Sequence, residues 1–100
     1  MNKTELLKRV ADHLSISHKD MLYIINAWED MFTEAIKEEG YVVMKGFGSF
    51  TLWQQSARPG RNPKTGKPAL ISARNSLKFK PGKDLLLKLN EGVDGNLHKE

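Results

Sequence analysis

A basic, proline-rich stretch is the part of this sequence best suited to bind another molecule. Residues 58–68 read RPGRNPKTGKP and lack any side chain large and apolar enough to anchor a core. The cations are Arg58, Arg61, Lys64 and Lys67, with Arg74 just beyond, and the prolines are Pro59, Pro63 and Pro68. Such a stretch cannot offset its ordering entropy of roughly 1–2 kcal/mol per residue by burial of its own side chains. We therefore expect a projecting arm that contacts a polyanion and carries something rigid at its tip.

The charge of the chain is strongly segregated around this arm. Residues 40–83 contain nine Lys or Arg and no Asp or Glu, whereas residues 1–39 contain five Lys or Arg and eight acids. A short charge run usually marks only a solvated surface. Nine cations without a counter-charge repel one another unless an anion neutralises them, and nucleic acid is the commonest large anion in a cytoplasm. The pattern therefore favours a nucleic-acid-binding protein.

The sequence gives little support to catalysis or metal binding. It has no cysteine, and its three histidines, at positions 13, 18 and 98, have no metal-ligand spacing on one helix. The segment GRNPKTGK has five residues between its glycines where a phosphate-binding P-loop has four, and Pro68 replaces the magnesium-binding Ser or Thr. No Ser or Thr is accompanied by a recognisable base and orienting acid. We predict no catalytic residue, no metal site and no cofactor.

Two helices are predicted before the basic segment. Asn2 and Glu5 have the capping-box spacing, and apolar residues then recur at helical intervals to Leu14. Ser17 and Asp20 repeat the cap signature, and the second helix ends near residues 38–40. Its apolar stripe, which includes Trp28 and Phe32, is too wide for one short helix to cover. The stripe fits an ordinary core helix, a dimer interface, or both.

The pattern changes to strands from Tyr41 onward. The expected strands are residues 41–44, 49–53, 69–71 and 77–80, with Phe79 directed to the body of the protein. Gly46 and Gly48 are expected to permit a turn between the first two. Pro81 and Gly82 stop the sheet, and residues 83–90 form a short third helix.

The length of 100 residues fits one domain, which we place at residues 1–90 with an arm at about 54–76. Residues 91–100 read as a flexible tail. A core this small favours stabilisation by dimerisation. No apolar run approaches a membrane span, MNKTELLKRV lacks the apolar region of a signal peptide, and the absence of cysteine fits a reducing compartment. We expect a cytoplasmic protein without a membrane partner.

Three segments, GFGSF (46–50), GRNPKTG (60–66) and FKPGK (79–83), together resemble the bacterial histone-like HU and integration host factor family. The resemblance covers about residues 1–90. It implies an α+β fold in an intertwined homodimer or heterodimer, with two N-terminal helices, a three-stranded antiparallel sheet, a long β-ribbon arm and a short C-terminal helix. It also implies a nucleoid-associated protein that bends and compacts double-stranded DNA from the minor groove.

The resemblance also implies roles for individual residues. Pro63 would wedge between base pairs and kink the duplex, because its ring is rigid, apolar and has no N–H. The other DNA contacts would come from Lys3, Arg58, Arg61, Asn62, Lys64, Lys67, Arg74, Lys78, Lys80 and Lys83. The dimer core would contain Trp28, Phe32, Phe47, Phe50 and Phe79. Trp53 and Gln55 depart from the family pattern, which often has arginines leading into the arm, so two phosphate contacts are expected to be missing or replaced.

Three functional hypotheses follow. The first is a largely sequence-neutral, HU-like DNA-bending protein. The second is a site-specific factor like integration host factor. The segment Ile71–Arg74 favours this second hypothesis, although indirect readout depends on fine details of shape. An RNA-binding module that uses the same basic ribbon is the third.

Overall fold

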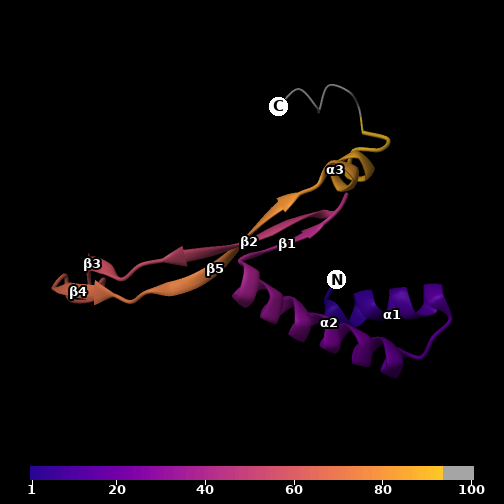
Figure 1. Ribbon diagram of the computed structural model, residues 1–100, viewed down its shortest axis with the longest axis horizontal. Coiled ribbons are helices and arrows are strands. Elements are labelled where there is room, and N and C mark those ends of the chain that lie inside the picture. The colour runs from indigo at the N-terminus through magenta and orange to yellow at the C-terminus, as the bar shows by residue number, and fades with distance from the viewer. Residues whose placement is uncertain (94–100) are drawn as a thin grey trace. The chain divides into compact units, whose positions relative to one another are not determined.

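The computed structural model describes residues 1–93, and the chain divides into two compact units, Met1–Glu38 and Glu39–Glu100 (Figure 1). The fold is α+β, as the resemblance implied. The first unit is helical, and the second contains two antiparallel sheets and a short helix. The predicted flexible tail at 91–100 lies, from residue 94 onward, outside the described residues.

The helical unit begins with α1 (Lys3–Leu14), which is followed by α2 (His18–Glu39). The Asn2 side-chain oxygen accepts a hydrogen bond of 2.9 Å from the backbone N–H of Glu5, and the Ser17 hydroxyl oxygen accepts one of 3.0 Å from the Asp20 N–H. Each bond satisfies a backbone donor that has no partner within the helix. Both helices therefore begin at the caps that the sequence predicts.

The apolar stripe of α2 remains largely at the surface of the single chain. The buried hydrophobic residues among those described are only Ala11, Met21 and Ile36. Trp28, which stacks on Phe32 with ring centroids 5.0 Å apart, is still 43% exposed. A single copy of the chain therefore leaves a large apolar surface in contact with water.

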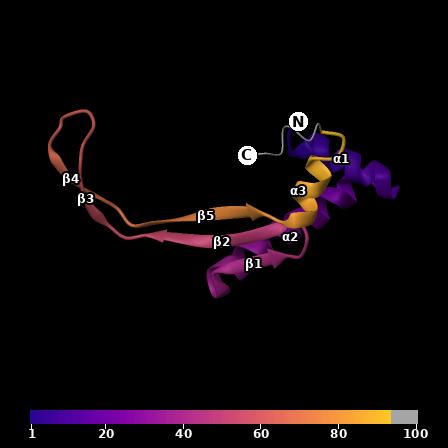
Figure 2. The ribbon, with the colours of Figure 1, turned by 90° about the horizontal axis from the view of Figure 1, so that it is seen from above.

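The second unit is built on a three-stranded antiparallel sheet in the order β1-β2-β5. Its strands are β1 (Tyr41–Met44), β2 (Gly48–Gln55) and β5 (Arg74–Pro81). β2 and β5 pair without interruption from Gly48 opposite Pro81 to Gln55 opposite Arg74. Figure 2 shows these two strands side by side as they run towards the arm. The predicted three-stranded sheet is confirmed, and β5 is longer than residues 77–80 because its pairing with β2 continues to Arg74.

The arm continues this ribbon with a second, two-stranded sheet of β3 (Arg58–Arg61) and β4 (Pro68–Ile71). Arg58 lies opposite Ile71, and Arg61 lies opposite Pro68. At the other end of the unit, the chain leaves β5 after Pro81 and forms α3 (Lys83–Leu89), whose C-cap is Asn90. Within residues 1–93, no helix is long and apolar enough to cross a membrane.

Gly46, in the turn between β1 and β2, and Gly48, the first residue of β2, both occupy positions that favour glycine. Gly46 has φ of 83°, which is unfavourable for side chains with a Cβ. At Gly48, an added Cβ would lie 2.4 Å from Cε1 of Phe79 and 2.7 Å from the carbonyl oxygen of Lys80. The turn therefore requires glycine at Gly46 for its backbone conformation, and the start of β2 requires glycine at Gly48 for close packing.

Candidate nucleic-acid interface

The strand register gives the ribbon one apolar and one cationic face, because successive side chains of a strand point to opposite sides. On the apolar face, Phe50 lies opposite Phe79 and Leu52 opposite Leu77. The opposite face, here called the cationic face, consists of Ser49, Thr51, Trp53 and Gln55 from β2 and Arg74, Ser76, Lys78 and Lys80 from β5. Three of the predicted DNA contacts thus lie along one surface.

The predicted aromatic core residues of the sheet are found on or next to the apolar face. The ring of Phe79 lies 4.8 Å from that of Phe50 and 5.8 Å from that of Phe47, measured between centroids. Phe47 and Phe79 remain 45% and 44% exposed in the single chain. This aromatic cluster stabilises the pairing of β2 with β5 from the side opposite the cationic face. Its exposed apolar surface is available for burial by another molecule.

Two contacts on the cationic face involve the residues that depart from the family pattern. Nζ of Lys78 lies 4.3 Å from the ring centroid of Trp53, and Nε of Arg74 donates a hydrogen bond of 2.7 Å to Oε1 of Gln55. Trp53 and Gln55 do not supply charge themselves, but each holds a cation from the neighbouring strand. Sequence reasoning had no means of finding these contacts without the register of β2 and β5.

The tip of the arm is a hydrogen-bonded loop around Pro63. The backbone N–H of Asn62 donates to the carbonyl oxygen of Lys67 at 2.8 Å, and that of Gly66 donates to the carbonyl oxygen of Asn62 at 2.7 Å. The side-chain oxygen of Asn62 accepts a hydrogen bond from the Lys64 N–H at 2.8 Å. Pro63 lies within this turn and is exposed. The sequence indicated the proline, but not that Asn62 orders the turn that contains it.

The cations of the arm are available to an external anion. Nη1 of Arg61 donates to the carbonyl oxygen of Gly66 at 3.0 Å, and the side chains of Arg58, Lys64 and Lys67 are exposed. The Lys–carboxylate pair among the described residues, Lys3–Glu29, lies in the helical unit, as does the contact of His18 Nε2 with Asp12 Oδ1 at 2.9 Å. Within residues 1–93, no cation of the ribbon forms an ion pair with an acidic side chain. The ribbon therefore presents an uncompensated positive charge.

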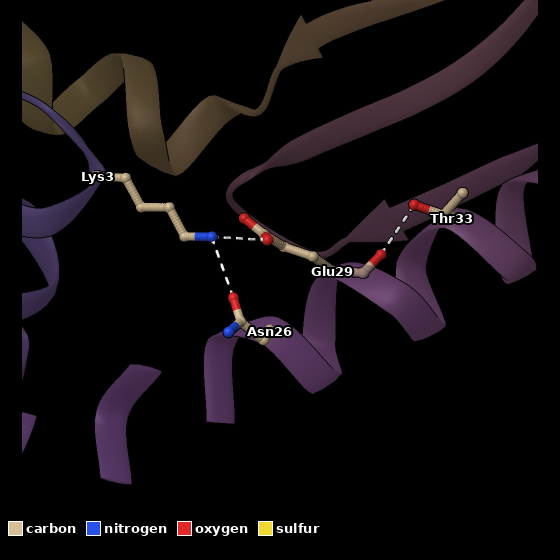
Figure 3. A network of polar contacts seen from close by, with 4 residues as sticks. All are labelled: Lys3, Asn26, Glu29 and Thr33. Carbon is tan, nitrogen blue, oxygen red and sulfur yellow. Dashed lines mark hydrogen bonds and ion pairs between the residues drawn. The ribbon is translucent and has the colours of Figure 1, made fainter. Parts of the chain in front are cut away.

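Lys3 and Lys83 have different surroundings from the ribbon cations. Nζ of Lys3 lies 2.9 Å from Oε1 of Glu29 and 3.1 Å from Oδ1 of Asn26, as Figure 3 shows. The Lys3 and Glu29 side chains are about half exposed, and such surface pairs stabilise by only about 0–1 kcal/mol. A phosphate can therefore compete with Glu29 for Lys3. Lys83 lies in the first turn of α3, in the other unit.

The described residues contain no group of three His, Cys, Asp or Glu side chains that could hold a metal ion. The ribbon instead combines exposed cations with a rigid apolar tip. Such a surface can bind several phosphates at once and insert a side chain between stacked bases.

Comparison with known proteins agrees with this geometry. The family model described as "Bacterial DNA-binding protein" matches residues 1–90. DNA-binding protein HU of Xylella fastidiosa (strain Temecula1) is 48% identical over 85 residues, which cover 85% of this chain and 90% of that protein. The integration host factor subunit alpha of Xanthomonas campestris pv. campestris (strain B100) is 35% identical, with coverage of 94% and 91%.

Among solved structures, an Anabaena HU–DNA cocrystal structure superposes with a TM-score of 0.76 at 36% identity, and the match covers 89% of this chain and 97% of that one. The similarity therefore extends through both units of the chain, in sequence and in fold.

Proposed function

This chain belongs to the bacterial DNA-binding protein family, and we propose that it is an architectural protein that bends and compacts duplex DNA. One observation carries the proposal: a ribbon whose cations have no acidic partner within residues 1–93 ends in an exposed proline held by a hydrogen-bonded turn. The similarity to DNA-binding protein HU and to HU in the HU–DNA cocrystal structure supports the same ligand. The proposed role is binding and bending, without catalysis or a cofactor.

In the proposed mechanism, the ribbon follows the minor groove of the DNA. Its cations neutralise phosphates, and the released counterions provide most of the sequence-independent affinity. The cationic face supplies Arg74, Lys78 and Lys80. The other contacts would come from Lys3, Arg58, Arg61, Asn62, Lys64, Lys67 and Lys83.

Pro63 would enter a base step and unstack it. Unstacking costs about a few kcal/mol, which the additional phosphate contacts of the bent duplex offset. The bond from Lys64 to the side chain of Asn62 supports this role, because it orders the turn before the DNA arrives.

We further propose that the active form is a dimer, in which two ribbons contact one duplex. The exposed stripe of α2 and the half-exposed aromatic cluster support this form, since a second copy would remove both surfaces from water. Trp28, Phe32, Phe47, Phe50 and Phe79 would lie in the shared core. A homodimer is the simplest assembly, and a related chain could replace one copy in a heterodimer.

The binding is proposed to be largely sequence-neutral. The HU relative is 48% identical, whereas the integration host factor subunit is 35% identical, which favours the HU-like form over a site-specific one. We expect the protein to act in the nucleoid of the bacterial cytoplasm, where the chromosomal duplex DNA is found.

A fluorescence-energy-transfer titration tests this proposal. A duplex of about 30 base pairs, labelled at both ends, is titrated with the protein at several salt concentrations. Energy transfer should rise as the ends approach, and log K should fall with log salt by about 0.9 per phosphate contacted. Binding that is nearly independent of salt, or that leaves the end-to-end distance unchanged, would contradict the proposal. Tighter binding to structured RNA of equal length would favour an RNA-binding module instead.

A further inference from the structure

We propose that Trp53 forms a stacking site for an unpaired base at the end of β2 from which the arm extends. Through this site the protein would bind a gapped duplex with bases opposite the gap more tightly than one without them. This inference rests on the proposed function, because the ribbon must first lie on DNA. It adds a base contact to a surface whose other contacts are to phosphates.

The position of Trp53 separates it from the three phenylalanines of the second unit. The rings of Phe47 and Phe50 each contact that of Phe79, and Phe50 and Phe79 lie on the apolar face. Trp53 lies on the cationic face of the β2–β5 ribbon, where its partner across the strands is the small residue Ser76. It is 43% exposed there. A ring that served only to pack the sheet would lie on the apolar face.

The immediate neighbours of Trp53 are those of a nucleic-acid-binding aromatic residue. Nζ of Lys78 lies 4.3 Å from the ring centroid. Gln55, two residues after Trp53 in β2, accepts a hydrogen bond from Arg74. A cation over an indole is attracted by the electrons of the ring. In proteins that bind single strands, cations follow the backbone while exposed aromatic rings stack on successive bases. Lys78 lies over one face of the Trp53 ring, so in the proposed complex a base stacks on the other face while Lys78 contacts the backbone.

The ribbon also has room for a displaced nucleotide just beyond Trp53. An open hollow of about 440 Å³ lies where β2 ends and β5 begins, lined by Gln54, Gln55, Ser56, Ala73, Arg74 and Asn75. Its volume is within the range of roughly 300–1,000 Å³ that is typical of small-ligand sites. Of its lining, Gln55 and Arg74 lie on the cationic face with Trp53, and both carry groups that can hydrogen-bond base edges. A base unpaired at a gap could therefore stack on Trp53 with its polar edge towards this hollow.

The experiment compares two duplexes with a short gap. In one, the nucleotides opposite the gap carry thymine; in the other they are abasic, so the phosphates and the flexible joint remain while the bases are removed. Base–aromatic stacking corresponds to roughly five-fold or more in affinity per base. Wild-type protein should bind the thymine-containing gap more tightly by at least that factor. An intact duplex, followed by energy transfer, reports the proposed bending separately.

Two variants of Trp53 and one of Lys78 identify the cause of this preference. Trp53→Phe should retain much of it, whereas Trp53→Leu, which keeps apolar bulk but has no ring, should lose it. Lys78→Gln should weaken binding to all the duplexes by a similar factor, because it removes a phosphate contact. A Trp53→Leu protein that still prefers the thymine gap would overturn the proposal, as would a wild-type protein that bends intact DNA but binds both gaps equally.

Tryptophan fluorescence provides a readout that does not depend on affinity. The sequence has two tryptophans, Trp28 and Trp53. The difference between the emission of wild-type protein and that of Trp53→Phe isolates the signal of Trp53. Stacking should quench this signal on the thymine gap and much less on the abasic gap at saturation. Equal quenching on both would mean that the ring senses the backbone only, which also contradicts a base-stacking site.

Discussion

The side-chain oxygen of Asn62 lies 2.8 Å from the backbone nitrogen of Lys64, and this hydrogen bond closes the turn that contains Pro63. Two backbone bonds, Asn62 to Lys67 and Gly66 to Asn62, close the loop beneath it. The proline at the end of the arm is thus held in place by bonds within the arm, while its ring remains exposed.

Replacement of this proline should separate bending from binding. In Pro63→Ala the cations of the ribbon are unchanged, so affinity for duplex DNA should fall only modestly. The bend angle should fall clearly, because alanine is too small to hold a base step open. Energy transfer on an end-labelled duplex at saturating protein measures the bend, and a gel shift measures the affinity. An unchanged bend angle at saturation would exclude Pro63 as the wedge.

Loss of the turn bond should reproduce part of this effect without removal of the proline. A typical hydrogen bond of this kind contributes about 0.5–1.5 kcal/mol, so Asn62→Ala should weaken the bent complex by up to about ten-fold. Asn62→Ser is the matched variant, because a serine hydroxyl can make the same local bond more weakly. The bend angle produced by Asn62→Ser should therefore lie between that of Asn62→Ala and that of the wild type. An Asn62→Ala protein that bends DNA like the wild type would show that the turn does not depend on this bond.

The features that local sequence determines were predictable, and those that depend on register were not. The capping pair of Asn2 and Glu5 predicted the start of α1 at residue 3, because a cap involves neighbours only, and the helical spacing of apolar residues predicted its end at Leu14. By contrast, the contact of Trp53 with Lys78 depends on the pairing of two strands separated by the whole arm. A one-residue slip of that pairing would place Trp53 on the other side of the sheet from Lys78.

The same reasoning applies to Lys3. Sequence alone indicated a cation near a helix start that is available to phosphate, but its carboxylate partner, Glu29, lies on the next helix. Such a contact depends on how α1 and α2 pack. Composition, in turn, was sufficient to predict the arm and its positive charge. Residues 40–83 contain no Asp or Glu, so however this segment folds, it cannot neutralise its own cations.

The salt dependence of binding should identify which cations contact phosphate. Lys80→Ala removes a charge from the cationic face, so the slope of log K against log salt should decrease by about 0.9. Lys37→Ala is the control, because Lys37 is an exposed residue in the last turn of α2 and outside the proposed interface. Titrations at four or more salt concentrations give both slopes. Equal slopes for the two variants would remove Lys80 from the interface.

The glycine beside the aromatic cluster should be important for stability. In Gly48→Ala, the new Cβ would overlap Phe79 and the Lys80 carbonyl oxygen, and such overpacking typically costs about 1–3 kcal/mol. Gly40→Ala is the comparison, since Gly40 has φ of 83° but nothing within 4 Å of an added Cβ. Its cost should be only that of the backbone conformation, about 1–2 kcal/mol. Urea unfolding at one protein concentration measures both, and the proposed packing is contradicted if Gly48→Ala is as stable as the wild type.

The exposed stripe of α2 should make the stability of the protein depend on its concentration. Ile24, Trp28 and Met31 are 50%, 43% and 58% exposed in a single chain, and a second copy that covers them would be released on unfolding. By mass action, the Tm of a dimer rises with protein concentration. Trp28→Glu should abolish dimerisation and this dependence, because it would bury an unpaired charge in the interface. Tyr23→Glu is the matched control on the same helix, since Tyr23 is 79% exposed and lies off the stripe. Sedimentation and thermal unfolding at two concentrations test both variants, and the proposed interface fails if Trp28→Glu remains a dimer with the wild-type Tm.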